Sequence, residues 1–266
     1  MSDFLQSMAE SSTERAAAVG ELPQADKPVV PLQLGDFDVI AEIKGRSPAE
    51  GDLSSEDDDR AERARQYARG GAAAISVLTE PSRFDGSLEH LEEVVAAVPD
   101  TPVMRKDFLV DPVQVREARS AGASGVLLIA TMLDDNKLRD TLDCAFEDNM
   151  FVLLESFDEN DLARVSKLLG EASYADMAAR DLLLVGINTR DLRTLAVDNE
   201  RLATLAPKLP AAPCVAESGL RSAEDVADVA AMGYRLALVG TALMRSDDPE
   251  ALVKTMRRAG AAKVAA

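Results

Sequence analysis

Residues 38–44 read DVIAEIK, and the stretch continues to residue 52 as GRSPAEGD. Its apolar residues are typical of a buried β-strand, yet Glu42 and Lys44 stand where further apolar residues are expected. Side chains at positions i and i+2 of a strand share a face, so Glu42 and Lys44 point the same way, above Ile40. Burying a charge costs several kcal/mol unless the charge is paired or used. The stretch therefore predicts a buried strand with functional groups at its carboxyl end.

Seven further apolar runs follow this one along the chain. Successive runs start roughly 20 to 35 residues apart, a spacing that fits a strand, a helix and two short loops. The runs are AAISVLT from 73, PVMRKDF from 102, GVLLIA from 125, FVLLES from 151, LLLVGINTR from 182, CVAESG from 214 and LALVG from 236. Amphipathic helical patterns lie between them, several opening with Ser or Asp and closing with Gly. The alternation predicts parallel strands with crossover helices.

The predicted fold class is α/β, a closed (β/α)8 TIM barrel with an N-terminal helical extension. An open doubly wound sheet would need a Gly-rich dinucleotide turn after its first strand, and IKGRSPAEG is not one. Residues 1–37 carry no strand pattern and are predicted to be the extension, with a helix around residues 2–19 and a Pro-containing linker. Residues 38–262 are predicted to form the barrel domain.

The composition indicates the kind of partner and compartment. A net charge of −18 argues against binding to nucleic acids or anionic membranes. Abundant Asp and Glu with little Lys indicates a halophilic organism, and an acidic protein of a mesophile is the alternative. Cys144 and Cys214 have no metal or redox spacing, and neither an export signal nor a membrane span is visible. We therefore expect a cytoplasmic protein.

Polar residues gather at the carboxyl ends of the predicted strands, which is the face where barrels carry active sites. Each residue alone is equally typical of a solvated loop or a structural ion pair. The joint pattern favours a functional cluster, because isolated buried charges are costly. The polar residues at these ends are Glu42, Lys44, Lys106, Glu155, Asn188, Arg190, Glu217 and Ser218.

The last two predicted strands end in small residues, as phosphate sites of barrels do. ESG after the seventh run and VGTALM after the eighth would present backbone amides from Gly219, Gly240 and Thr241. Ser47, in the sequence RSP, is a candidate hydroxyl donor from across the mouth. VGTAL taken alone is also typical of an ordinary turn.

Taken together, these stretches resemble the indole-3-glycerol phosphate synthase family. The matching stretches are AEIKGRSP, SVLTEPSRFDGS, PVMRKDF, VLLIA, LLES, GINTRDL, VAESG and LVGTALM, in family order across residues 38–245. The resemblance implies a barrel enzyme that converts 1-(2-carboxyphenylamino)-1-deoxyribulose 5-phosphate to indole-3-glycerol phosphate, CO₂ and water. It implies no metal and no cofactor, a phosphorylated small-molecule substrate, and a monomer.

The resemblance also assigns roles to the polar residues. Lys106 is expected to be the general acid of the condensation and Glu155 the acid/base of the dehydration. Lys44 would bind the substrate carboxylate or act as a second acid, and which lysine serves which step stays open. Glu42 would hold Lys44 in place and charged, and Asn188 would orient the reacting groups.

Other positions match the substrate-binding residues of the family. Phe84, Phe108 and Leu127 correspond to the apolar slot for the anthranilate ring, although each is also typical of ordinary core. Lys44, Lys106 and Arg190 would make a local positive well for the anionic substrate. Glu217 and Ser218 match polar residues at the mouth.

The chain departs from the family pattern in three places. Gly45 replaces a bulkier or basic residue, and GEASYADMAARD before the sixth strand is longer than usual and predicts an extra surface helix. The acidic N-terminal extension is only loosely similar, so its contribution to covering the active site is open. His90, the one histidine, lies in a helical pattern and is predicted to be structural.

Two other functions remain as alternatives. Phosphoribosylanthranilate isomerase, a barrel of the same pathway, is expected to use a Cys at the end of its first strand, where this chain has Glu42 and Lys44. A non-catalytic barrel that binds sugar phosphates could keep ESG and VGTAL, but it would be free to lose the acid/base groups that are present here.

Overall fold

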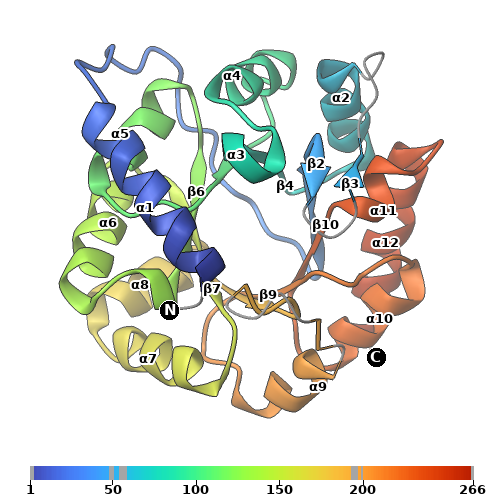
Figure 1. Cartoon of the computed structure of the whole chain (residues 1–266). Coiled ribbons are helices and arrows are strands. Elements are labelled where there is room, and N and C mark those ends of the chain that lie inside the picture. Colours follow the sequence, from blue (N-terminus) through green and yellow to red (C-terminus); the bar gives the residue numbers. More distant parts are fainter. Residues whose placement is uncertain (1–2, 48–50, 54–58, 193–196, 199, 265–266) are drawn as a thin grey trace.

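The computed structural model describes residues 3–47, 51–53, 59–192, 197–198 and 200–264. Within these ranges, eight parallel strands close into a barrel in the order β1-β10-β9-β8-β7-β6-β5-β4, with helices around them (Figure 1). The strands are β1 (Asp38–Ile43), β4 (Ala74–Leu78), β5 (Val103–Lys106), β6 (Gly125–Ile129), β7 (Phe151–Ser156), β8 (Leu183–Asn188), β9 (Cys214–Glu217) and β10 (Leu236–Val239). The predicted strands and the predicted (β/α)8 barrel are confirmed.

Each strand is apolar on both faces because each face meets a different hydrophobic layer. Ile40, Met104 and Leu153 belong to the cluster inside the barrel, whereas Val39 and Val152 belong to the cluster between strands and helices. Every residue of β1 and β8 is buried, as expected for parallel strands covered on both sides. This alternation decides which side chains reach the barrel interior.

Helices return the chain from the carboxyl end of each strand. The longer ones are α2 (Arg60–Gly70), α4 (Leu88–Ala97), α5 (Pro112–Ser120), α6 (Asp135–Glu147), α7 (Glu159–Leu169), α10 (Ala223–Ala231) and α12 (Pro249–Val264). Side-chain caps begin several of them: the Asp111 carboxylate accepts from the Val113 amide, and the Ser222 hydroxyl accepts from the Asp225 amide. Gly71 ends α2 at φ 83°, a conformation that favours glycine.

Short elements sit in the loops. After β1, β2 (Arg46–Ser47) and β3 (Gly51–Asp52) form an antiparallel ribbon. The remaining short helices are α3 (Pro81–Phe84), α8 (Ala172–Ala179), α9 (Arg201–Leu205) and α11 (Thr241–Met244), with 3-10 turns at Ala130–Met132 and Ala206–Lys208. Helix α8 confirms the extra helix predicted for the long segment before the sixth strand.

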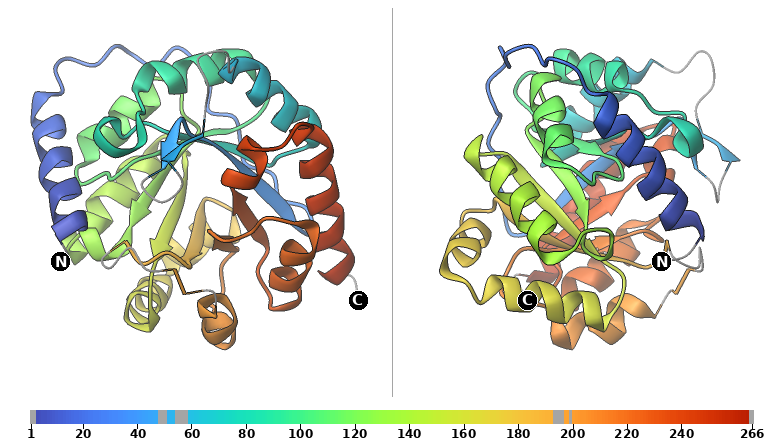
Figure 2. Two further views of the ribbon diagram at one scale, coloured as in Figure 1. Left: turned by 45° about the vertical axis from the view of Figure 1, so that its right-hand side comes forward. Right: turned by 60° about the vertical axis from the view of Figure 1, so that its left-hand side comes forward.

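The N-terminal helix α1 (Asp3–Ala18) lies across the face formed by the carboxyl ends of the strands, in front of α5 and β6 in the view of Figure 1, and Figure 2 shows it from two further sides. Leu5 and Met8 are buried within it. The guanidinium of Arg15 donates two hydrogen bonds of 2.8 Å to the carboxylate of Asp107, which follows β5. The side chain of Gln114 on α5 donates to the Ser12 hydroxyl at 2.9 Å. The predicted helix is thus confirmed, and it is fastened to the barrel by buried polar contacts.

Several smaller expectations can be compared with the structure. Cys144 and Cys214 are both buried and free. His90 lies on α4, and burial lowers the pKa of its imidazole. None of the helices in the described ranges combines the length and the apolar character that a membrane crossing requires. The division into residues 1–37 and 38–262 stays a prediction.

Candidate active site

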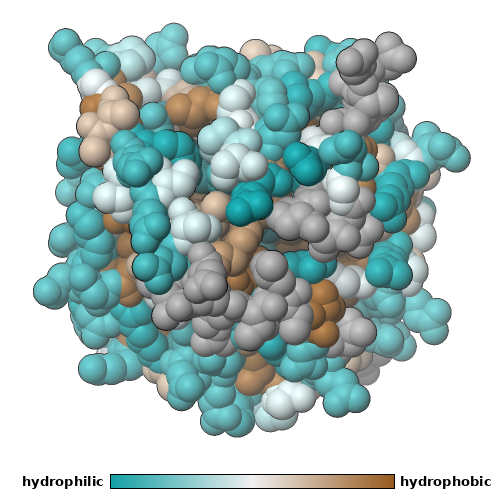
Figure 3. Space-filling model, viewed as in Figure 1, coloured by the Kyte–Doolittle hydropathy of each residue, from teal (hydrophilic) through white to brown (hydrophobic). Residues whose placement is uncertain are grey.

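A cavity of about 770 Å³ opens at the carboxyl ends of the barrel strands. Figure 3 shows hydrophilic residues over most of this face and apolar residues toward its centre. The sequence-predicted site residues that line the cavity are Glu42, Lys44, Phe84, Lys106, Phe108, Leu127, Glu155, Asn188, Arg190, Ser218, Gly219, Gly240 and Thr241. The predicted cluster is therefore brought together by the fold.

Two predicted residues stand apart from this lining. Glu217 was expected at the mouth, but it is 0% exposed and reaches the site through a 3.5 Å contact with the ammonium of Lys106. Its place at the end of β9, with its side chain turned inward, explains the difference: the barrel buries it below the opening. The side chain of Ser47 lies outside the described part of the chain, so its predicted role stays a prediction.

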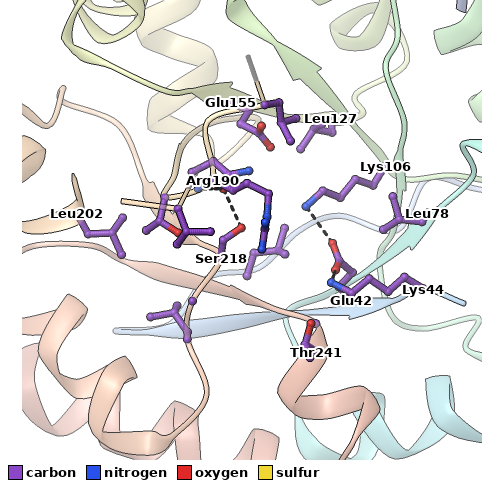
Figure 4. A pocket seen from close by; sticks show the side chains of 18 of the residues that line it. Glu42, Lys44, Leu78, Lys106, Leu127, Glu155, Arg190, Leu202, Ser218 and Thr241 are labelled. Carbon is purple, nitrogen blue, oxygen red and sulfur yellow. Dashed lines mark hydrogen bonds and ion pairs between the residues drawn. The ribbon is translucent and has the colours of Figure 1, made fainter. Parts of the chain in front are cut away.

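Glu42 holds two lysines at once. Its Oε1 lies 2.6 Å from Nζ of Lys44 and its Oε2 lies 2.9 Å from Nζ of Lys106 (Figure 4). Burial alone would raise the pKa of Glu42, but the charges of Lys106 and Lys44 outweigh it and lower the pKa to about 2. The carboxylate is thus a permanent anion. The sequence predicted the contact with Lys44 but not the one with Lys106.

The same contacts keep the Lys106 ammonium charged. Burial favours its neutral form, but the carboxylates of Glu42 and then Glu217 outweigh burial and raise the pKa of Lys106. In Figure 4 the Lys106 side chain extends into the opening from one wall while Arg190 extends from the opposite wall. A charged N–H donor therefore faces the cavity.

Gly240 makes room for the Glu42 and Lys44 pair. A Cβ atom at this position would lie 2.3 Å from Oε1 of Glu42 and 2.9 Å from Nζ of Lys44. Real contacts of a Cβ are longer, so either the carboxylate or the ammonium would have to move. The glycine that the sequence suggested for phosphate binding thus also has a steric role in the charged cluster.

Glu155 and Glu217 form a second buried pair, of like charge. Burial raises the pKa of both carboxyl groups, and the charge of Glu155 raises that of Glu217 further. A Cβ at Gly186, the register partner of Glu155, would lie 2.0 Å from Oε1 of Glu217. The Glu217 carboxyl group therefore lies directly over β8, in space that only a glycine leaves open.

Asn188 organises the side of the cavity formed by β8 and β9. Its Oδ1 accepts hydrogen bonds from the Ser218 hydroxyl at 2.7 Å and from the Arg190 amide at 2.9 Å. The Asn188 side chain also opposes the rise in the pKa of Glu155. Ser218 has φ 66°, which turns the chain so that its hydroxyl reaches Asn188.

An apolar wall faces the charged groups. The rings of Phe84 and Phe108 lie 6.1 Å apart between centroids, and the ring of Phe4 contacts Phe108 edge-on at 6.0 Å. Phe4 lines the cavity, so α1 contributes to the site. Nothing in the sequence indicated this, because Phe4 is one apolar residue in a weakly similar extension.

Three further residues of the cavity lining could have been predicted from the alternation of side chains along the strands. Leu78, Ile129 and Leu238 line the cavity and point inward with the same alternation that places Lys106 and Glu155. Strand parity alone could have found them. In the described ranges there is no group of three or more His, Cys, Asp or Glu side chains arranged to hold a metal ion.

Comparison with known proteins shows which family the chain belongs to. The family model described as indole-3-glycerol phosphate synthase matches residues 29–256. The chain belongs to the indole-3-glycerol phosphate synthase family. A relative of that name from Nocardioides sp. is 46% identical over 251 residues, which cover 93% of this chain and 91% of the relative. Another, from Methanopyrus kandleri, is 47% identical over 226 residues, covering 84% of this chain and 83% of the relative.

Solved structures with little sequence similarity share the fold. The chain is similar to 3-hexulose-6-phosphate synthase from Salmonella typhimurium, with a TM-score of 0.64 and 17% identity over 85% of this chain and 100% of that one. A thiamine phosphate pyrophosphorylase from Pyrococcus furiosus gives a TM-score of 0.59 at 15% identity, over 87% and 98% of the two chains. At such identities the likeness shows the barrel fold alone.

Membership of the indole-3-glycerol phosphate synthase family gives the activity. The enzyme is a carboxy-lyase of tryptophan biosynthesis, and its reaction closes an indole ring with loss of CO₂ and water. This sets aside the isomerase and the non-catalytic barrel as alternatives. The residues that carry out each step are a separate question.

Proposed function

We propose that Lys106 is the general acid of ring closure in this indole-3-glycerol phosphate synthase. The supporting observation is the contact of 2.9 Å between its Nζ and Oε2 of Glu42, which keeps an ammonium charged at the wall of the cavity. In ring closure, the aromatic carbon attacks the ketone of the substrate, and the ketone oxygen takes up a proton. A positioned N–H donor lowers the barrier to that step.

The substrate is bound through its two anionic ends and its aromatic ring. Lys44 and Arg190 supply positive charge in a protein whose net charge is −18, so the local field at the mouth opposes the field of the whole molecule. The ring of the anthranilate part fits the wall of Phe84, Phe108 and Leu127. Once the ring has closed, loss of CO₂ restores its aromaticity.

The phosphate end is proposed at the opposite side of the mouth. Gly219 follows the turn at Ser218 and has φ 79°, and Thr241 begins α11 just after β10. Both residues line the cavity, and backbone amides at such positions in barrels are suited to phosphate oxygens. Ser47, in the ribbon after β1, is proposed as an additional hydroxyl donor.

Glu155 is proposed as the acid/base of the dehydration. The second step removes the former ketone oxygen as water and removes a proton from carbon. Glu155 is 1% exposed and its Oε1 has no hydrogen-bond partner in the structure, so it is a carboxyl oxygen that can accept a proton from the substrate. Asn188 would hold it in position, and Lys44 or Lys106 would protonate the departing hydroxyl.

Two experiments test these assignments. The purified protein should convert the carboxyphenylamino-deoxyribulose phosphate to a product with indole fluorescence, across a series of salt concentrations. Lys44→Ala distinguishes its two roles: a carboxylate partner raises KM with little change in kcat, whereas a second acid lowers kcat. Unchanged KM and kcat in Lys44→Ala would remove it from both roles.

We also propose that the enzyme works as a monomer in a cytoplasm of high salt concentration. The acidic composition supports the high salt concentration, since salt screens repulsion among the excess carboxylates, and the monomer is the state that the resemblance to the family implies. Light scattering at increasing NaCl concentrations gives the mass in solution, and thermal unfolding gives the salt dependence of stability. A dimer mass or a melting temperature that falls with added salt would contradict this part of the proposal.

A further inference from the structure

A line of neighbouring ionisable side chains crosses the floor of the cavity. Lys106 contacts Oε2 of Glu217 at 3.5 Å, and the carboxyl group of Glu217 lies over Gly186, which is the register partner of Glu155 on the neighbouring strand. The residues come from β5, β9 and β7, so no single strand aligns them. The line joins the proposed acid of the first step to the proposed base of the second.

The chemistry leaves these two end groups in the wrong protonation state. Ring closure breaks an N–H bond of the Lys106 ammonium and forms an O–H bond on the substrate, which leaves a neutral amine. Dehydration breaks a C–H bond and forms an O–H bond on Glu155, which leaves a neutral carboxylic acid. The next turnover needs the Lys106 ammonium and the Glu155 carboxylate again.

Glu155 has little contact with solvent through which to lose this proton. Its side chain is buried at 1% exposure, and Glu217 beside it is at 0%. Glu217, in contrast, contacts Lys106 and lies over Gly186, the register partner of Glu155, in space that is open only because Gly186 has no Cβ. A buried pair of carboxyl groups is costly, and Lys106 compensates it only through Oε2 of Glu217, while Oε1 has no hydrogen-bond partner in the structure.

On the basis of the roles proposed above, we propose that Glu217 is a proton relay that returns to Lys106 the proton that Glu155 removes from the substrate. Glu217 gives the proton of its carboxyl O–H group to the Lys106 amine and takes the proton of Glu155 in its place. The Glu217 carboxyl group therefore ends protonated, as it began, and the relay neither gains nor loses a proton. A second proton, used to expel water, is recovered from solvent.

The variant Glu217→Gln tests the relay because an amide takes the same space but does not pass the proton on. Glu42, at 2.9 Å, still holds the Lys106 ammonium charged at the start. The first turnover, followed by rapid quench, is expected to stay within about 3-fold of the wild type. Steady-state kcat is expected to fall by 10-fold or more, giving a burst of about one product per site.

Controls separate the relay from other causes. Glu224→Gln, on the exposed start of α10, should leave both rates unchanged. The Kd of the product must stay the same in Glu217→Gln, since slow product release would also give a burst. A first turnover slowed as much as steady state would mean that Glu217 only positions Lys106, and an unchanged kcat would also overturn the relay.

If the role proposed for Glu155 is itself wrong, the variants give a different result. Glu155→Gln should lose most of its turnover, including the first. If Glu155→Gln turns over normally, the proposed base is wrong and the relay has no donor. If Glu155→Gln is inactive while Glu217→Gln shows no burst, the relay alone is wrong.

Discussion

The carboxylate of Glu42 lies 2.9 Å from the ammonium of Lys106, although their strands β1 and β5 are separated in the barrel by β4. The other oxygen of the same carboxylate lies 2.6 Å from Lys44. One buried anion thus compensates two cations, and the burial of each charge is tolerated because of the others. If one of these lysines is replaced, the other remains paired with the Glu42 carboxylate. Either lysine can therefore be substituted without leaving that buried carboxylate unpaired.

Lys106→Ala is expected to lose most of its kcat, roughly 10²- to 10⁴-fold, because the general acid is gone. The fold should persist, since Lys44 still compensates Glu42. Steady-state fluorescence assays measure the loss, and circular dichroism checks the fold. Lys137→Ala, which removes an exposed lysine paired with Asp111, serves as the control. Near-normal turnover in Lys106→Ala would remove this residue from the acid role.

Gly240→Ala is expected to lower kcat/KM by 10-fold or more while the barrel stays folded. The added Cβ would lie 2.3 Å from Oε1 of Glu42, so the carboxylate must shift and both lysines with it. Gly20→Ala is the matched control, because a Cβ there would meet nothing within 4 Å. Equal activity of the two variants would show that the charged cluster tolerates this displacement.

Arg15→Ala is expected to destabilise the protein by about 2 kcal/mol, because it removes the charge-assisted hydrogen bonds from Arg15 to the buried Asp107 carboxylate. Arg105 and Thr79 still contact this carboxylate, so the barrel should fold. KM should rise as well, since α1 carries Phe4 into the cavity wall. Urea unfolding and substrate titration measure the two effects.

The control for Arg15→Ala is another arginine whose ion pair is exposed. Arg180 pairs with Asp176 within α8 at 3.5 Å, and such pairs contribute about 1 kcal/mol or less. Arg180→Ala should therefore leave stability and KM nearly unchanged. If Arg15→Ala is no more destabilised than Arg180→Ala, the N-terminal helix is not held by the Asp107 contact.

Sequence patterns were sufficient for the barrel and for the inward face of each strand, because both follow from local alternation. Glu42 and Lys44 were placed together on this ground, as the structure has them. The contact between Glu42 and Lys106 could not be found in this way. It joins β1 and β5, which are not neighbours in the barrel, and it depends on how far the two long side chains reach across the interior.

The burial of Glu217 and the contribution of Phe4 were missed for related reasons. Strand parity says which way a side chain points but not how deep its strand end lies, so Glu217 was expected at the mouth. Phe4 is positioned by Arg15 and Asp107, 92 residues apart in the chain, and no periodicity links such a pair. Contacts of this range are decided by packing.

Asn188→Ala is expected to move the acid limb of the pH profile of kcat/KM to higher pH. As the proposed base, Glu155 must be ionised, so activity is lost as the pH falls through its pKa. Burial raises this pKa, while the charge of Lys106 and the hydrogen bond from Asn188 lower it. Removing the amide takes away a lowering contribution, so the pKa of Glu155 rises and protonation begins at a higher pH.

Measurements of kcat/KM over a pH series at constant ionic strength give the pH at which the acid limb lies. Asn136→Ala, an exposed substitution at the start of α6, should leave the profile unchanged. Because Asn188 also accepts from Ser218, the variant will lose some activity at every pH, and that loss changes the height of the profile but not the position of its limb. A limb that stays in place or moves to lower pH would show that the titrating base is not Glu155.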